Sequence, residues 1–109
     1  MIGRNQMFDV QIVRGREPGS VYCGRPSPLG NPFQMEREED RNAVCDAYAD
    51  WFDQNLETLK PVLRKLWQKG MSDGVLLLSC WCAPKRCHLE TVKQFFEDQM
   101  NVSQTDWSG

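Results

Sequence analysis

The segment that most constrains the fold is residues 74–100, where an apolar strand, a tight turn and a helix follow one another. Residues 75–78 are continuously apolar after a glycine, which is typical of a strand buried on both faces. Pro84 cannot extend that strand because it has no backbone N–H. After Cys87, apolar residues recur at helical spacing. The turn therefore carries the N–H groups and the partial positive charge of a helix start, where an anion is favoured.

Four other stretches of the chain have recognisable patterns. Residues 7–13 alternate between apolar and polar and predict a first strand, and residues 21–23 predict a short second strand. The amphipathic run 36–55 predicts a long helix with acidic residues in its first turns. Pro61 is expected to break this pattern, so that a second helix covers residues 61–69. The resulting order of elements is β-β-α-α-β-α.

This order predicts a small α/β layer fold with a short, mostly parallel sheet and three to four helices. A right-handed crossover should carry the helical pair over the sheet. The chain of 109 residues is the size of one domain, expected at residues 1–100 with a polar tail at 101–109. The net charge of −2 gives no global field to hold nucleic acid, so no extended nucleic-acid binding is expected.

The sequence pattern also bears on location. No apolar run approaches the ~20 residues of a membrane span, and the first residues lack the apolar core of a signal peptide. Three of the five cysteines lie within eight positions, which does not fit a disulfide framework. We therefore expect reduced thiols or metal ligands in a cytoplasmic protein that makes no contact with a membrane.

A stiff loop precedes the long helix. Residues 24–33 contain three prolines and two glycines, which exclude helix and strand but also restrict the backbone. Such a loop can hold Arg25, Ser27 and Asn31 in fixed positions for binding a ligand. The alternative is a rigid connector whose apolar residues fill the core.

The cysteine-rich turn allows three interpretations, of which the first is a metal site. Zinc prefers side chains of the types found in the cluster Cys80, Cys82, Cys87 and His88. The spacing is imperfect for four ligands, because adjacent residues on a helix diverge by about 100°. Cys23 could complete a set if its short strand lies alongside. Zinc is therefore an alternative cofactor rather than a firm prediction.

The second interpretation is catalytic, with the same four residues as candidates. Cys80 and Arg86 stand in a Cys-x5-Arg relation, as in thiol phosphatases, and Lys85 would help to stabilise a thiolate. The intervening residues include a proline and no glycine, unlike an amide-rich phosphate cradle. The third interpretation is structural: the cysteines pack as small apolar groups, Trp81 fills the core and His88 makes a local hydrogen bond. The residues alone leave all three open.

Two motifs carry a resemblance to a known family. Residues 24–33 read Gly-Arg-Pro-Ser-Pro-Leu-Gly-Asn-Pro-Phe, and residues 78–88 read Leu-Ser-Cys-Trp-Cys-Ala-Pro-Lys-Arg-Cys-His. Together they resemble an uncharacterised domain family that is common in bacteriophages and also found in bacteria, over about residues 22–92. The resemblance implies a phage-type protein in which the loop and the turn form one pocket. Leu89 departs from the family pattern, which usually has glycine after the Cys-His pair.

Two hypotheses of function follow. The first is a polar pocket at the carboxyl ends of the strands that binds a phosphorylated small molecule, a nucleotide or a nucleotide derivative. Arg25 and Arg86 would hold phosphate with Lys85 nearby, while Ser27 and Asn31 would supply polar contacts. The second is a small non-enzymatic interaction protein, with or without a zinc staple, that acts on a host protein partner. The sequence does not decide whether a reaction is catalysed.

Overall fold

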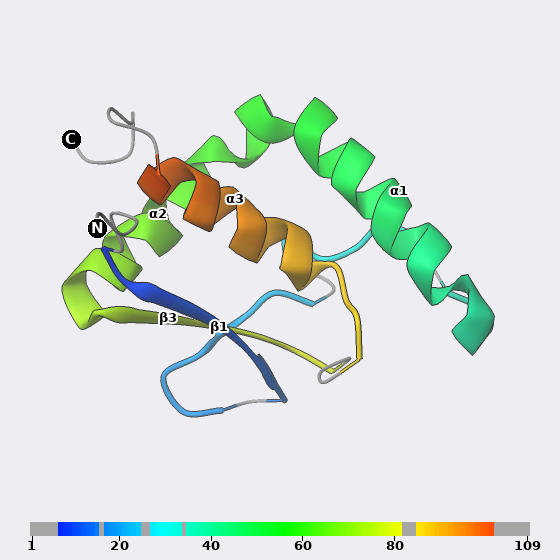
Figure 1. The fold of residues 1–109 in the computed structure, drawn as a ribbon, viewed down its shortest axis with the longest axis horizontal. Helices are drawn as coiled ribbons and strands as arrows, with labels where there is room; N and C mark the ends of the chain where they lie inside the picture. The colour runs from blue at the N-terminus through cyan, green and yellow to red at the C-terminus, as the bar shows by residue number, and fades with distance from the viewer. Residues whose placement is uncertain (1–6, 16, 25–26, 34, 82–84, 102–109) are drawn as a thin grey trace, which may run out of the picture.

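The computed structural model describes residues 7–15, 17–24, 27–33, 35–81 and 85–101, the last residue by its backbone alone. These residues follow the predicted order of strands and helices (Figure 1), with a 3₁₀ turn, η1, added before the first α-helix. The elements are β1 (Asp9–Arg14), β2 (Val21–Tyr22), η1 (Glu38–Asp40), α1 (Arg41–Gln54), α2 (Leu56–Asp73), β3 (Val75–Cys80) and α3 (Leu89–Asn101).

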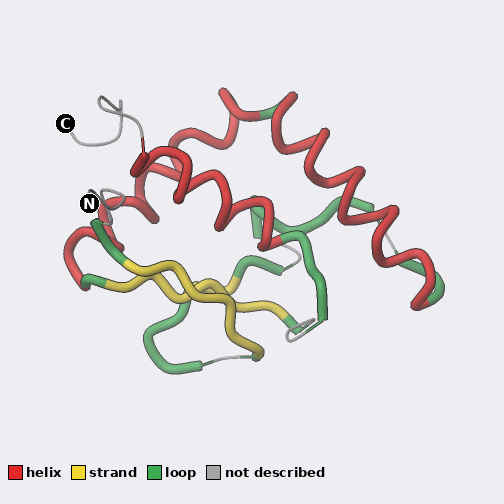
Figure 2. Tube along the Cα trace, in the orientation of Figure 1, coloured by secondary structure: helices red, strands yellow, loops and turns green. Residues whose placement is uncertain are grey.

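The three strands form one parallel sheet in the order β1-β3-β2, with β3 in the centre. Val10 and Ile12 of β1 pair with Leu76 and Leu78 of β3, and Val21 pairs with Leu78 from the other side. Figures 1 and 2 show the helices on one side of the sheet. Helices α2 and α3 pack on the strands, and α1 contacts the other two helices. The predicted α/β fold with a short parallel sheet is therefore confirmed.

The core lies between the sheet and the helices. Leu76 at the centre of the sheet is fully buried, as are Trp67 of α2 and Phe96 of α3. The ring of Phe8, just before β1, meets Trp67 edge-on with centroids 5.2 Å apart. Gly70 permits this contact, because a Cβ at that position would lie 2.6 Å from the Phe8 ring. The apolar patterns predicted at residues 7–13, at residues 75–78 and after Cys87 include Phe8, Leu76 and Phe96, respectively.

The prediction that Pro61 separates the two middle helices is wrong. Pro61 lies inside α2, where it is exposed, and the chain turns at Asn55 instead. Asn55 leaves helical geometry with φ −109°, and its Nδ2 donates to the Trp51 carbonyl at 2.8 Å. The buried stripe of α2 continues on both sides of Pro61, and its packing outweighs the one backbone hydrogen bond that proline removes. Gly74, with φ 80°, ends the helix in the left-handed conformation.

The helix predicted at 36–55 begins later than expected, because residues 38–40 form η1 and α1 begins at Arg41. Two further boundaries differ near the cysteine-rich turn. Strand β3 continues to Cys80, and α3 begins at Leu89, so Cys87 lies just outside the helix. The predicted tail at 101–109 lies outside the described residues except for the backbone of Asn101, which ends α3. Among the described residues, no helix is both long and apolar enough to span a membrane.

Candidate functional site

A cavity of about 410 Å³ opens at the carboxyl edge of the sheet. Its walls come from the ends of β2 and β3, the loop before α1, the first turns of α1, and the turn before α3. The described lining residues are Tyr22, Gly24, Asn31, Phe33, Met35, Arg41, Val44, Cys45, Cys80, Trp81, Arg86, Cys87 and His88. The proline-rich loop and the cysteine-rich turn therefore meet at one concave surface.

Parallel pairing explains why these two distant segments meet. Strands β2 and β3 run in the same direction, so both end at this edge of the sheet. The pairing continues one residue past β2, where the Cys23 N–H donates to the Ser79 carbonyl at 2.8 Å. The loop then crosses to α1, where the Tyr48 hydroxyl donates to the Leu29 carbonyl at 2.8 Å. Leu29 is buried, so the loop also serves as a core connector.

Two thiols of the turn lie side by side. The Sγ atoms of Cys80 and Cys87 are 3.3 Å apart, and both residues are buried while lining the cavity. Cys45 of α1 is a third buried thiol in the same wall. No disulfide is formed among the described cysteines. Of the three candidate cysteines in the turn, the structure therefore brings Cys80 and Cys87 together.

The metal interpretation concerns Cys80, Cys82, Cys87 and His88. Cys82 lies outside the described residues. Among the residues that the structure describes, no group of three or more His, Cys, Asp or Glu side chains is placed to hold a metal ion. Cys80, Cys87 and His88 are therefore not placed to form a three-ligand site by themselves. Zinc binding that includes Cys82 stays a prediction.

His88 links the turn to the end of β2. Its Nε2 lies 2.9 Å from the carbonyl oxygen of Cys23, so this nitrogen carries a proton and donates it. The imidazole is buried and meets the Tyr48 ring edge-on, with centroids 5.0 Å apart. The structural interpretation expected a local hydrogen bond, whereas this one joins residues 65 positions apart in the sequence. A catalytic role for His88 stays a prediction.

Two buried groups beside the cavity are held in their neutral forms. Burial, with a smaller contribution from Cys80, raises the pKa of the Cys23 thiol to about 12. Burial likewise raises the pKa of the Tyr48 hydroxyl. Neither group is ionised near neutral pH, so Cys23 behaves as a small apolar residue and not as a reactive thiolate.

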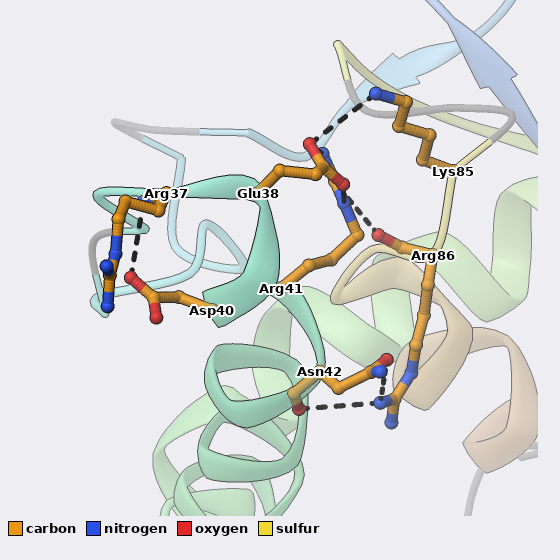
Figure 3. Close-up of polar contacts among 7 residues, drawn as sticks. All are labelled: Arg37, Glu38, Asp40, Arg41, Asn42, Lys85 and Arg86. Atoms are coloured by element: carbon orange, nitrogen blue, oxygen red, sulfur yellow. Dashed lines mark hydrogen bonds and ion pairs between the residues drawn. The ribbon is translucent and has the colours of Figure 1, made fainter.

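Two arginines supply the charge in the cavity wall (Figure 3). Arg41 binds both carboxylate oxygens of Glu38, and its Nη1 donates to the backbone carbonyl of Arg86 at 2.8 Å. Arg86 extends toward α1, where it donates to Asn42 Oδ1 at 3.0 Å. It also donates to Asp46 Oδ1 at 2.9 Å. The hydrogen bond that Arg86 donates to Asp46 raises the pKa of Arg86. No carboxylate is among the described lining residues.

Glu38 connects the first turn before α1 with the cysteine-rich turn. Besides Arg41, it accepts from Lys85 Nζ at 3.4 Å (Figure 3). The hydrogen bond from Arg41, with the charges of both cations, lowers the pKa of Glu38 to about 2. Lys85, predicted as a ligand contact, is therefore paired with a carboxylate and is not among the lining residues.

The three loop residues that were predicted to contact a ligand differ in their position relative to the cavity. Asn31 lines the cavity, but its Oδ1 accepts from the Phe33 N–H at 2.9 Å and its Nδ2 donates to the Val44 carbonyl at 3.4 Å, so it shapes the loop. Ser27 is not among the lining residues, and its buried Oγ has no hydrogen-bond partner in the described part of the chain. Arg25 lies outside the described residues.

Sequence reasoning missed Arg41 and misjudged Trp81. Arg41 appeared only as one charged residue in an acid-rich helix start, and no local pattern marks its contact with Arg86, 45 positions away. Trp81 was considered as a core residue in the structural interpretation, but it is 55% exposed and lines the cavity. Its ring packs over Gly15, whose Cβ position would be 3.2 Å from it. Its place three residues after Leu78, beyond the end of the apolar run, was the available signal.

Comparison with known proteins adds one match. A family model described as a domain of unknown function, DUF4326, matches residues 10–98, which include every described residue that lines the cavity. No curated protein and no solved structure matches the chain. Origin in a bacteriophage stays a prediction.

Proposed function

The chain belongs to the DUF4326 family of domains of unknown function, and we propose that its cavity binds a phosphorylated small molecule, a nucleotide or a nucleotide derivative. The observation that carries the proposal is the pair of arginines, Arg41 and Arg86, in a wall without described carboxylates. The net charge of the whole chain is −2, so an anion site has to be local, as this one is.

The two guanidinium groups are held in place from outside the cavity. Glu38 binds Arg41, and Asp46 with Asn42 binds Arg86. A guanidinium has five N–H donors in a planar fork, so a carboxylate on one edge leaves the group able to bind an anion on another. Pre-orientation of this kind lowers the entropy lost on binding. The arginines therefore suit a phosphate better than flexible surface lysines would.

The rest of the wall suits a flat, partly apolar group. The volume of about 410 Å³ is within the range of small-molecule sites, roughly 300–1,000 Å³. Trp81 and Phe33 are exposed aromatic side chains on the wall, and Met35 is exposed beside them. Aromatic rings stack on nucleobases, at about 1–3 kcal/mol for each base. A nucleotide combines such a face with a phosphate, which is why we favour it over a sugar phosphate.

The test is a calorimetric titration with nucleoside monophosphates, nucleoside diphosphates, the parent nucleosides and sugar phosphates. We expect a nucleoside phosphate to bind and its parent nucleoside to bind at least tenfold more weakly. Arg86→Gln should weaken binding by roughly 10- to 100-fold, since a hydrogen bond to a charged group contributes about 1.5–3 kcal/mol. Arg64→Gln is the matched control, because it removes an exposed arginine of α2 that is not among the lining residues.

Two results would contradict the proposal. One is folded protein that binds no member of the panel at millimolar concentration. The other is equal weakening by Arg86→Gln and Arg64→Gln, which would indicate a general charge effect and not a site.

A host protein partner is the second candidate, and the exposed side chains of Phe33, Met35 and Trp81 are what favours it. Large apolar side chains in one surface region are common at protein interfaces. A cavity behind these side chains favours the small molecule. Two results together would support the partner instead. The original chain would bind no small molecule, and Trp81→Ala would abolish a protein complex in pull-down experiments.

A further inference from the structure

We propose that Cys80 and Cys87 form a dithiol redox site, which reduces a hydroperoxide that enters through the cavity and closes to a disulfide. The proposal goes beyond phosphate binding and does not depend on it. It rests on the position of the two sulfur atoms, on their shared access to the cavity, and on the contrast with the other described thiols.

The two sulfur atoms are close to bonding distance. Their separation of 3.3 Å is about 1.3 Å longer than a disulfide bond of about 2.05 Å. Each cysteine is held at a defined place in the backbone: the Cys80 carbonyl accepts from the Gly15 N–H at 2.8 Å, and the Cys87 carbonyl accepts from the Glu90 N–H at 3.1 Å. Cys80 ends β3, and Cys87 lies two residues before α3.

Access distinguishes this pair from Cys23. Cys80 and Cys87 are only 2% and 3% exposed, but both line the cavity, so a small solute reaches them from that side. Cys23 is equally buried, is not among the lining residues, and has a pKa raised to about 12. Cys45 lines the cavity from α1 and is the natural comparison for simple accessibility.

The chemistry balances with a hydroperoxide as oxidant. One thiol, as its thiolate, attacks the outer oxygen of the hydroperoxide; the O–O bond breaks, and an alcohol (or water, from hydrogen peroxide) leaves with the thiol proton. The resulting sulfenic acid is attacked by the second thiol, which forms the S–S bond and releases water. Two electrons pass from the two thiols to the peroxide. An external thiol returns the pair to its reduced form by two successive exchange reactions.

The test uses the whole chain, reduced and then treated with a small excess of hydrogen peroxide. We expect the loss of two thiols in each chain, a mass lower by two hydrogens, and recovery of both on addition of dithiothreitol. Peptide mapping without reduction should identify the Cys80–Cys87 crosslink. This mapping needs no variant, so it decides the proposal even if a substitution prevents folding.

Variants then test the assignment. Cys80→Ala and Cys87→Ala should each abolish the loss of two thiols, and dimedone should trap a sulfenic acid in the variant that keeps the attacking cysteine. Cys45→Ala, the matched control from the same wall, should still lose two thiols. A crosslink that includes Cys45 or Cys82, thiols that do not react on the time scale of minutes, or uniform oxidation of all five cysteines would overturn the proposal.

Discussion

The two ends of strand β3 lie in opposite environments. Near its start, Leu76 is fully buried beneath the aromatic cluster of Phe8, Trp67 and Phe96. At its end, Cys80 faces a cavity whose wall includes arginines, thiols and the half-exposed Trp81. Over the four positions from Leu76 to Cys80, the strand thus passes from close-packed apolar side chains to the wall of a cavity.

This difference shows which end of β3 can carry a functional site. At the packed end, each side chain is fixed by dispersion contacts with neighbours of the same kind. At the open end, the groups that meet come from distant parts of the chain, as when Arg41 donates to the Arg86 carbonyl. The packed end should therefore determine stability, and the open end should determine binding. The predictions below separate the two.

The largest expected effect is on stability, at the packed end. Phe96 is fully buried against Phe8 and Trp67, so Phe96→Ala should lower the free energy of unfolding by about 3–5 kcal/mol. Urea denaturation followed by tryptophan fluorescence measures this loss. The fraction of the Phe96→Ala variant that stays folded should bind the nucleotide with unchanged affinity. A loss below 1 kcal/mol would mean that this cluster is not the core.

A smaller loss is expected at Gly70, where α2 meets the same cluster. Alanine normally favours a helix over glycine by about 1 kcal/mol. Here its Cβ would lie 2.6 Å from the Phe8 ring, and overpacking costs about 1–3 kcal/mol. Gly70→Ala should therefore fail to stabilise the protein and should destabilise it by up to about 2 kcal/mol. Ser72→Ala, at an exposed position of the same helix, is the control and should be neutral or slightly stabilising in the same denaturation experiment.

The parts of the structure that the sequence predicts follow the same division between the packed end and the open end of β3. Continuous or alternating apolar runs placed β1 and β3 and identified Phe8 and Leu76 as core, because burial leaves a periodic trace in the sequence. The second helix was misplaced because Pro61 is a strong local breaker signal, whereas packing of the stripe on both sides of it is a tertiary effect. Asn55, the true boundary, carries a weaker signal.

The site was predictable as a place but not as a set of contacts. Two motifs that each follow a parallel strand had to end at one edge of the sheet, and residues of both line the cavity. The role of Arg41 was not predictable, since it depends on a contact across 45 positions. The pairing of Lys85 with Glu38 was equally invisible, because a lysine beside a turn looks the same whether it meets a ligand or a carboxylate.

The third prediction changes the open end while keeping its charge. Arg41→Lys removes the two-oxygen contact with Glu38 and the bond to the Arg86 carbonyl, since an ammonium cannot reproduce a planar fork. We expect nucleotide affinity to fall about tenfold and stability to fall by about 1 kcal/mol. Arg64→Lys in α2, outside the described lining residues, is the control for binding and should leave nucleotide affinity unchanged. Calorimetry and urea denaturation on the same samples check both values, and unchanged affinity would remove Arg41 from the site.

The smallest expected effect is the pH dependence of the Glu38 contact. The pKa of Glu38 is lowered from 4.5 to about 2 in the folded chain, chiefly by the hydrogen bond from Arg41. Its contribution to stability is therefore complete above about pH 4.5 and is lost as the pH falls toward 2. The difference in Tm between the original chain and Glu38→Gln should shrink over that window, and salt should reduce it at neutral pH because the group is exposed. A difference that does not change with pH would contradict this contact.

The central claim, that the open end of β3 binds a ligand and the packed end does not, is tested most directly by the indole N–H signals of the tryptophans. Trp81 lines the cavity and Trp67 lies in the core, so NMR titration with a nucleoside phosphate follows both regions in one experiment. We predict that the Trp81 indole signal moves in a saturable way and that the Trp67 signal stays in place. No movement of Trp81 at millimolar nucleotide, or equal movement of both signals, would contradict the account.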